Sequence, residues 1–264
     1  MPQFKIQKHE KNYYLLISAL IAAVLFSCQS IFDEENKVSN NPQDNIGQLH
    51  NEGMDYILNE ITQLPKTKSG IRVVDISHIK LATISFMKKK ELLNNRITKS
   101  TYSDNFPDSI NFSDVSMTNI QKEYLIRLID ILSVPKEADL KKITNNIIEL
   151  ENEILENKAI EEDERFPILC GCSVARYSAV YWTENLEKWK VEIMGINNSQ
   201  QKIITTKSGD PEEGFWDGVW DIAKEDAIGA ALGALGGAGM GGIGAGPGAI
   251  GGGCIASGTE AAHK

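Results

Sequence analysis

The stretch AIGAALGALGGAGMGGIGAGPGAIGGGCIASGT, residues 227–259, decides the fold class of this chain. Its 33 residues carry no charge, and 14 of them are glycine. Gly229, Gly233, Gly237 and Gly241 recur at every fourth position, so in a helix they form a smooth ridge along which another backbone can approach closely. The spacing predicts a glycine zipper.

A proline divides this stretch and predicts a hairpin. Pro247 interrupts the repeat, and small residues continue beyond it at the same spacing, as Ala249, Gly253, Ser257 and Ala261. Two such helices, joined at residues 246–248, would lie against each other. The first arm, residues 227–246, would reach about 30 Å as a helix, the thickness of the hydrocarbon core of a bilayer. The sequence leaves open whether the hairpin inserts into a membrane, stays buried against the preceding helices or forms a disordered tail.

The helix that leads into the hairpin carries an aromatic stripe. Asp210 and Pro211 mark its start, and one face then collects the apolar residues Trp216, Val219, Trp220, Ala223 and Ala227. Such a face suits a membrane interface as well as a protein core, although the opposite face is acidic where a binder of anionic lipid would be basic. We assign residues 210–264 to one glycine-zipper, membrane-active segment.

Apolar residues at helical spacing predict a helical domain over residues 47–160. Pro65 ends its first helix, and further helices are expected at 76–95 and 116–134. After Pro135 an a/d seam of heptads runs through Leu140, Ile143, Ile147, Leu150 and Ile154. The seam indicates a pair of helices packed into their own core, with a partner-binding coiled coil as the alternative.

Residues 161–167, EEDERFP, predict an acidic linker between two halves of the chain. Charged connecting segments are where proteases cut, so Arg165 is a candidate cleavage site. The segment that follows, residues 168–209, holds the aromatic residues Tyr177, Tyr181, Trp182 and Trp189 at spacings that suit a helix or a strand. A helix is favoured, and any small β element is expected between residues 168 and 206.

The N-terminus has the layout of a secretory signal peptide, residues 1–27. Three lysines precede an uncharged apolar run at 13–26, which as a helix is shorter than the roughly 30 Å that a spanning segment needs. The sequence Leu-Phe-Ser before Cys28 resembles the bacterial lipobox, which implies lipidation of Cys28, with plain secretion of an unlipidated chain as the alternative. Residues 28–46 predict a disordered tether. Its acidic cluster at 33–35 resembles the signal that sends Bacteroidetes lipoproteins to the cell surface, so we expect an outer-membrane or surface lipoprotein.

Charge and composition exclude several functions. The chain carries a net charge of −9, and removal of the signal peptide leaves 24 basic and 35 acidic residues, which argues against a nucleic-acid partner. We find no nucleophile with a base and no paired carboxylates in a motif, so we expect neither an enzyme nor a cofactor. The histidines after the signal peptide are His50, His78 and His263.

The cysteines beyond Cys28 are Cys170, Cys172 and Cys254. An odd number in an oxidising compartment predicts one disulfide with a free thiol, or an intermolecular bridge. A bond from Cys170 or Cys172 to Cys254 would tie the hairpin to the middle of the chain. A zinc site that adds His263 is disfavoured because Cys-x-Cys is an atypical spacing, so we expect no metal.

The lipobox, the tether and residues 210–264 together resemble secreted, bacteriocin-like antibacterial toxins, and most of all the proteolytically activated pro-toxins of gut Bacteroidales. The resemblance implies cleavage near Arg165 by an activating protease, release of residues 166–264 and self-association in the lipid of a target membrane. The acidic charge departs from the cationic character common in bacteriocins, which implies a receptor on the target cell. The competing class is a non-toxic envelope lipoprotein that acts as a binding or self-associating scaffold.

Overall fold

The chain is mainly helical, as predicted. The computed structural model describes residues 37–93, 116–133, 140–195, 211–239 and 244–263. All of these except Lys37 belong to one unit, Val38–Lys264. These ranges contain no strand, and residues 168–194, where a small β element was considered, are helical. The predicted signal peptide and Cys28 lie outside the described residues.

The first two helices of the described ranges are α2 (Asp44–Thr62) and α3 (Ile76–Lys89), which contact each other. Asp75 caps α3, because its carboxylate accepts hydrogen bonds from the backbone N–H groups of Ser77 and His78 at 2.9 and 3.1 Å. The sequence predicted a disordered tether over residues 28–46 and a first helix from residue 47. In the structure α2 begins three residues earlier, and Asn41 is already buried.

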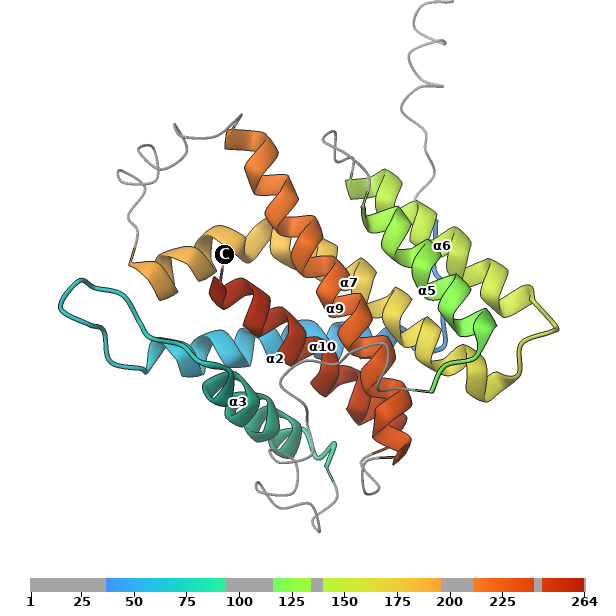
Figure 1. Cartoon of the computed structure of the whole chain (residues 1–264), viewed down its shortest axis with the longest axis horizontal. Coiled ribbons are helices and arrows are strands. Elements are labelled where there is room, and N and C mark those ends of the chain that lie inside the picture. Colours follow the sequence, from blue (N-terminus) through green and yellow to red (C-terminus); the bar gives the residue numbers. More distant parts are fainter. Residues whose placement is uncertain (1–36, 94–115, 134–139, 196–210, 240–243, 264) are drawn as a thin grey trace, which may run out of the picture. The chain divides into compact units, whose positions relative to one another are not determined.

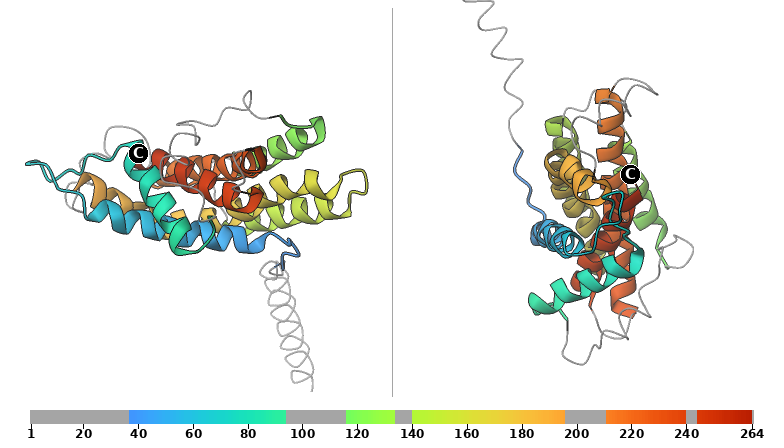
Figure 2. Two further views of the ribbon diagram at one scale, coloured as in Figure 1. Left: turned by 90° about the horizontal axis from the view of Figure 1, so that it is seen from below. Right: turned by 90° about the vertical axis from the view of Figure 1, so that its left-hand side faces the viewer.

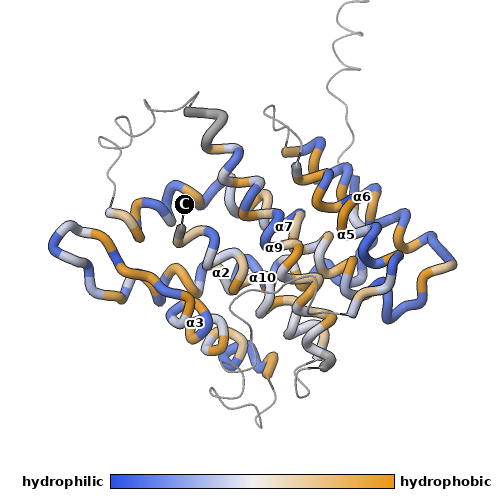
Figure 3. Tube along the Cα trace, in the orientation of Figure 1, coloured by the Kyte–Doolittle hydropathy of each residue, from blue (hydrophilic) through white to orange (hydrophobic). Residues whose placement is uncertain are grey.

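The next two helices, α5 (Asn119–Leu132) and α6 (Leu140–Glu156), form a pair. Thr118 and Gln121 form a capping box at the start of α5. Figure 3 shows strongly hydrophilic and hydrophobic positions alternating along both helices. The α6 seam is buried at Ile143, Ile147, Leu150 and Ile154. It packs against α7 as well as α5, so the pair shares the core of the whole unit and does not form a core of its own.

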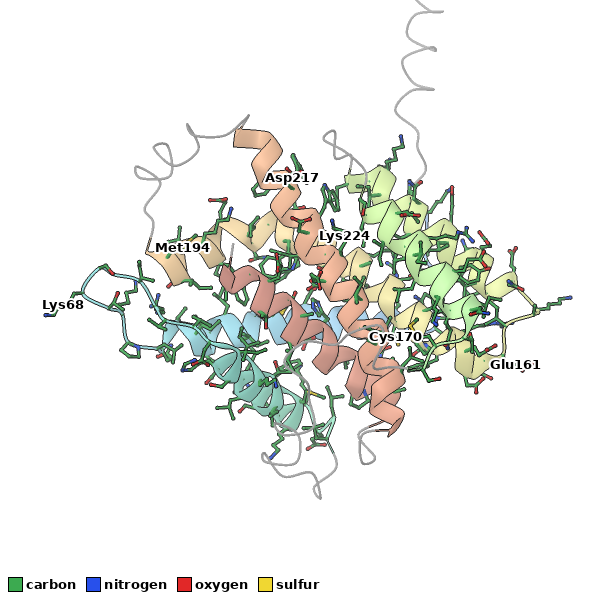
Figure 4. The ribbon with its side chains drawn as sticks, in the orientation of Figure 1. Lys68, Glu161, Cys170, Met194, Asp217 and Lys224 are labelled. Atoms are coloured by element: carbon green, nitrogen blue, oxygen red, sulfur yellow. The ribbon has the colours of Figure 1, made fainter. Side chains whose placement is uncertain are left out.

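The longest described helix, α7 (Glu162–Met194), replaces the predicted acidic linker and the aromatic segment after it. Its 33 residues extend about 50 Å at 1.5 Å per residue. Glu161 and Met194, labelled in Figure 4, mark its two ends. The linker prediction was wrong because the acidic residues favour the positive N-terminal end of a helix, and the Glu161 N–H donates to Glu164 Oε2 at 3.2 Å.

The last two described helices, α9 (Pro211–Gly239) and α10 (Ala245–His263), form a hairpin. The predicted joint at residues 246–248 was wrong, because Pro247 lies in the first turn of α10, where a proline is tolerated. Figure 1 shows them side by side near the centre of the unit, and Figure 2 shows them from two further sides. Helix α9 contacts α5 and α7, whereas α10 contacts α2, α3 and α7. We call the helices α2, α3, α5 and α7 the sheath, because they cover the hairpin.

Candidate functional site

The hairpin is held together by backbone packed on backbone. A Cβ atom placed on Gly229 would lie 2.6 Å from Gly252 O, and one placed on Gly237 would lie 2.5 Å from Gly244 O. Gly233 and Gly248 approach each other more closely still. No residue larger than glycine fits these positions without moving a helix. The three described glycines of the α9 ridge therefore form a zipper within the chain, as the sequence predicted.

The partner ridge on α10 differs from the prediction. The residues of α10 that face α9 are Gly248, Gly252 and Ala256. Gly253 faces α2 instead, where an added Cβ would lie 2.9 Å from His50 Cδ2. The prediction was wrong by one position because small residues cover more than one face of α10. The other predicted ridge residue, Gly241, lies outside the described residues.

The first uncharged arm ends sooner than the predicted residue 246, because the Gly244 N–H donates to Gly237 O at 3.1 Å and the chain has turned back by Gly244. Helix α9 is described as far as Gly239, and Gly244 adopts a φ of +85° at the start of the second arm, a conformation that favours glycine. The uncharged part of α9, 13 residues from Ala227, reaches only about 20 Å at 1.5 Å per residue. Within the described ranges, no helix combines the length and the apolarity needed to cross a membrane.

The hairpin is buried over most of its described length. The α9 residues Ala227, Ala230 and Ala231 and the α10 residues Ala249 and Ile250 are at most 1% exposed. The sheath also contributes small residues: a Cβ on Gly171 of α7 would lie 3.1 Å from Ala227 O. The aromatic stripe of α9 is split, since Val219 and Trp220 are buried whereas Trp216 is half-buried and stacks on Trp220. In this state the zipper and most of the stripe serve as core.

A buried polar cluster lies where four helices meet. It comprises His50 of α2, Ser178 and Trp182 of α7, Asp226 of α9, and Ser257 of α10, and we call it the polar junction. Each of these residues is fully buried. Asp226 Oδ2 accepts hydrogen bonds from Ser178 Oγ and from Trp182 Nε1, the latter at 2.9 Å, while His50 Nε2 lies 3.7 Å from the same oxygen. The junction ties α9 to α7 and α2 at the base of the hairpin.

Burial sets the electrostatics of this junction. Desolvation raises the pKa of Asp226 above its usual value, although His50, Ser178, Ser257 and Trp182 each act to lower it. Although Ser257 lies close enough to Asp226 to affect its pKa, neither Asp226 Oδ1 nor Ser257 Oγ has a hydrogen-bond partner of good geometry among the described residues. The arrangement is not a catalytic triad, because the Ser178 hydroxyl donates to the aspartate and not to the histidine.

The polar junction was not predicted from the sequence. Asp226 is the last charge before the uncharged stretch, and it lies between the apolar positions Ile222, Ala223 and Ala230 at helical spacing. His50 likewise lies among the buried positions of α2. A polar residue in the middle of an apolar helix face was the available signal.

A second charged cluster fixes the start of α2. Glu151 of α6 is fully buried and accepts hydrogen bonds from Ser39 Oγ and Asn41 Nδ2 at 2.7 and 2.8 Å. Arg176 of α7 donates to Glu151 Oε1 at 3.1 Å and also pairs with Asp44. We call these five residues the clasp. The clasp joins the chain before α2 to α6 and α7.

The three described cysteines are free thiols, each fully buried, so the disulfide that the sequence left open is not formed in this structure. Burial raises the pKa of Cys170, Cys172 and Cys254 well above that of an exposed thiol, which suppresses the reactive thiolate. Across the described ranges, no three His, Cys, Asp or Glu side chains gather as metal ligands would.

Arg165 lies in the first turns of α7 and not in a linker. Its Nη2 donates to Asn157 O at 2.8 Å, and Phe166 after it is half-buried. A protease needs an extended backbone at the bond that it cuts, so cleavage here requires the start of α7 to unwind. The cut would also leave α2 packed on α7 and α10.

We therefore expect the Arg165–Phe166 bond of the native chain to resist an arginine-specific protease. Mass spectrometry of timed digests would show cleavage at this bond only when a denaturant unwinds the start of α7. Rapid cleavage under native conditions, at the rate of an unfolded peptide, would contradict this expectation.

Comparison with known proteins adds no family. No protein-family model, no curated protein and no solved structure matches this chain.

Proposed function

We propose that this chain is a secreted, lipid-anchored antibacterial pro-toxin, which stores a membrane-active glycine hairpin inside a helical sheath. The observation that carries the proposal is the burial of an uncharged, glycine-lined hairpin at the centre of the unit. Cys28 would carry the lipid anchor at the outer membrane or cell surface. Cleavage near Arg165 by an activating protease, once the start of α7 has unwound, would then permit release of the hairpin.

The composition of the hairpin supports this proposal. A core helix is normally built from large aliphatic residues, because they bury most apolar area. Glycine contributes almost none and costs about 1 kcal/mol relative to alanine in a helix interior. What glycine does provide is close backbone contact, which holds helices together even where water is absent and the hydrophobic effect is lost. A glycine hairpin thus suits a segment that has to stay paired in lipid.

The length of the arms limits how the hairpin acts. Arms of about 20 Å do not cross the roughly 30 Å hydrocarbon core as single straight helices. The hairpin would therefore enter the membrane as a pair and permeabilise it together with other copies. An acidic chain gains nothing from anionic lipid, so on cells a receptor would raise its concentration at the membrane, whereas on vesicles excess protein takes that role.

The shortness of the arms also favours a second candidate, a non-toxic envelope lipoprotein that binds a partner or forms a scaffold. In that case the hairpin is a permanent core, and its glycine ridges are used only within the chain. The two candidates differ in whether release of the hairpin harms a membrane.

Dye leakage from phosphatidylethanolamine and phosphatidylglycerol vesicles tests the proposal. The samples are the intact mature chain, the same chain cut after Arg165, and the cut chain carrying Gly233→Ala, with Gly246→Ala as the control. Killing of bacteria that lack the gene is measured in parallel. We expect leakage and killing from the cut chain and from its Gly246→Ala form only. If every sample is inert on vesicles and cells, the scaffold function stands instead.

A further inference from the structure

The tautomer of His50 is fixed by its neighbours. Its Nδ1 lies 3.1 Å from Asn51 Oδ1, and Asn51 Nδ2 donates to Tyr177 O at 2.9 Å, which settles the orientation of the amide. Since Asn51 Oδ1 can only accept, His50 Nδ1 carries a hydrogen. In a neutral imidazole Nε2 is then bare, and this bare nitrogen faces Asp226.

Asp226 presents acceptors to that nitrogen. Its Oδ2 already accepts from Ser178 and Trp182, and Oδ1 has no partner of good geometry in the described part of the chain. If Asp226 is charged and His50 is neutral, the lone pair of His50 Nε2 faces the lone pairs of the Asp226 carboxylate, and the negative charge of that carboxylate is fully buried. One proton on either residue removes the conflict.

Among the described residues, the other ionisable groups around the junction place no positive charge beside Asp226. Helix α7 contributes only neutral groups, Ser178 and Trp182. Helix α10 contributes the neutral Ser257 hydroxyl, the Cys254 thiol, whose pKa Asp226 helps to raise, and Glu260. Glu225 of α9 interacts with both Glu260 and Asp226, and its negative charge opposes that of Asp226. Lys224, labelled in Figure 4, pairs with Asp221 at 2.9 Å. His50 is thus the basic side chain that faces the buried carboxylate.

We propose that one proton, held between His50 and Asp226, is a latch that keeps the glycine hairpin in its sheath. With the proton in place, α9 remains joined to α2 and α7. When the proton leaves to a base in solution, the junction keeps an uncompensated anion, and the hairpin opens to hydrate it. The latch concerns only how the hairpin is held, so it can hold or fail independently of any action on membranes.

The sign of the pH dependence follows from burial. Burial raises the pKa of Asp226 in the folded chain, so the folded pair keeps its one proton at a pH where the unfolded pair, with ordinary values of about 3.9 for aspartate and about 6.5 for histidine, has lost both. The stability that this proton contributes is therefore present below about 6.5 and is lost as pH rises above it. For a single linked proton, the population of the open state rises up to tenfold per pH unit in that range. The hairpin should therefore loosen toward alkaline pH.

Thiol labelling measures this opening. Cys254 lies at the junction, with its thiol donating to His50 O at 3.6 Å, whereas Cys172 interacts with the clasp residues Glu151 and Arg176. Two full-length chains, both carrying Cys28→Ser and Cys170→Ala, would keep only one of these thiols through Cys172→Ala or Cys254→Ala. Maleimide labelling from pH 5 to 9, normalised to the unfolded chain at each pH, gives the protection of each thiol.

We expect protection of Cys254 to fall with pH while that of Cys172 changes little. Asp226→Asn should abolish the slope, because its amide supplies a permanent hydrogen toward His50. Asp217→Asn, the same change at an exposed position of α9, should keep it. Equal slopes at both thiols, or a slope that survives Asp226→Asn, would overturn the latch. No membrane enters this experiment, so its failure is distinct from failure of the proposed toxin.

Discussion

Gly233→Ala should be among the most damaging single substitutions in this chain. Its added Cβ would meet the Gly248 carbonyl and would lie 3.1 Å from Gly252 Cα. Both obstacles are backbone, so no side chain can rotate away and the helices must separate. We expect the free energy of unfolding to fall by roughly 3 kcal/mol, at the upper end of the 1–3 kcal/mol usual for an overpacked core. Urea denaturation followed by circular dichroism would measure it.

Gly246→Ala is the matched control for that substitution. It adds the same methyl group to the same hairpin, but the new Cβ would lie at an ordinary 3.7 Å from Ile46 Cδ1. Since alanine favours a helix over glycine by up to about 1 kcal/mol, this variant should be as stable as the wild type or slightly more. Equal losses in both variants would show that the close approach of the two backbones does not matter.

Arg176→Met should produce a loss of similar size by another route. Arg176 is 12% exposed and its partner Glu151 is fully buried. Methionine leaves that carboxylate without its cation, and removal of one partner from a buried ion pair costs about 3–5 kcal/mol. We also expect faster hydrogen exchange at the first turn of α2, because Asp44 loses the same partner.

Arg127→Met separates this effect from a simple loss of charge. Arg127 also pairs with a glutamate, Glu153, but the two side chains are 40% and 49% exposed. Exposed ion pairs contribute about 0–1 kcal/mol to stability, so the free energy of unfolding of this variant should lie within about 1 kcal/mol of the wild-type value. A loss as large as that of Arg176→Met would mean that burial does not distinguish the two pairs.

The clasp also predicts the response to acid. Burial raises the pKa of Asp44, but hydrogen bonds from Arg176 and Tyr177 more than offset this, so the pKa lies below its usual value. A lowered pKa stabilises the fold above the unfolded value of about 3.9, and the stabilisation is lost as pH falls through the folded value. Unfolding measured from pH 6 to pH 3 should show a shallower acid loss in Arg176→Met. An unchanged acid response would argue against the role of Arg176.

Local patterns predicted the helices well. The apolar spacing of α5 and α6 and the heptad seam of α6 depend only on neighbours three and four positions away, and these neighbours are fixed by the sequence. The ridge of α9 was predictable for the same reason, because glycines at every fourth position lie on one face of a helix. The position of the turn was not, because glycines occur throughout residues 236–253. The start of α7 was not, since an acidic run is typical of both a linker and a helix N-terminus.

The features that the sequence did not predict depend on contacts between distant segments. The phase of α10 was missed because glycine and alanine cover several of its faces, so the choice between Gly252 and Gly253 is made by the connection to α9 and by packing against α2. The pairing of His50 with Asp226 joins residues 176 positions apart, and no local pattern encodes it. The clasp likewise depends on where the segment before α2 meets α6.

The contact of Gly233 with Gly248 also constrains how this sequence can change over time. In an ordinary core, a residue that grows larger can be accommodated by a neighbour that becomes smaller. Glycine has no smaller replacement, so a mutation on one ridge cannot be compensated by a mutation on the other. We therefore expect these positions to stay glycine in every descendant that keeps the hairpin, while the sheath around them is free to vary.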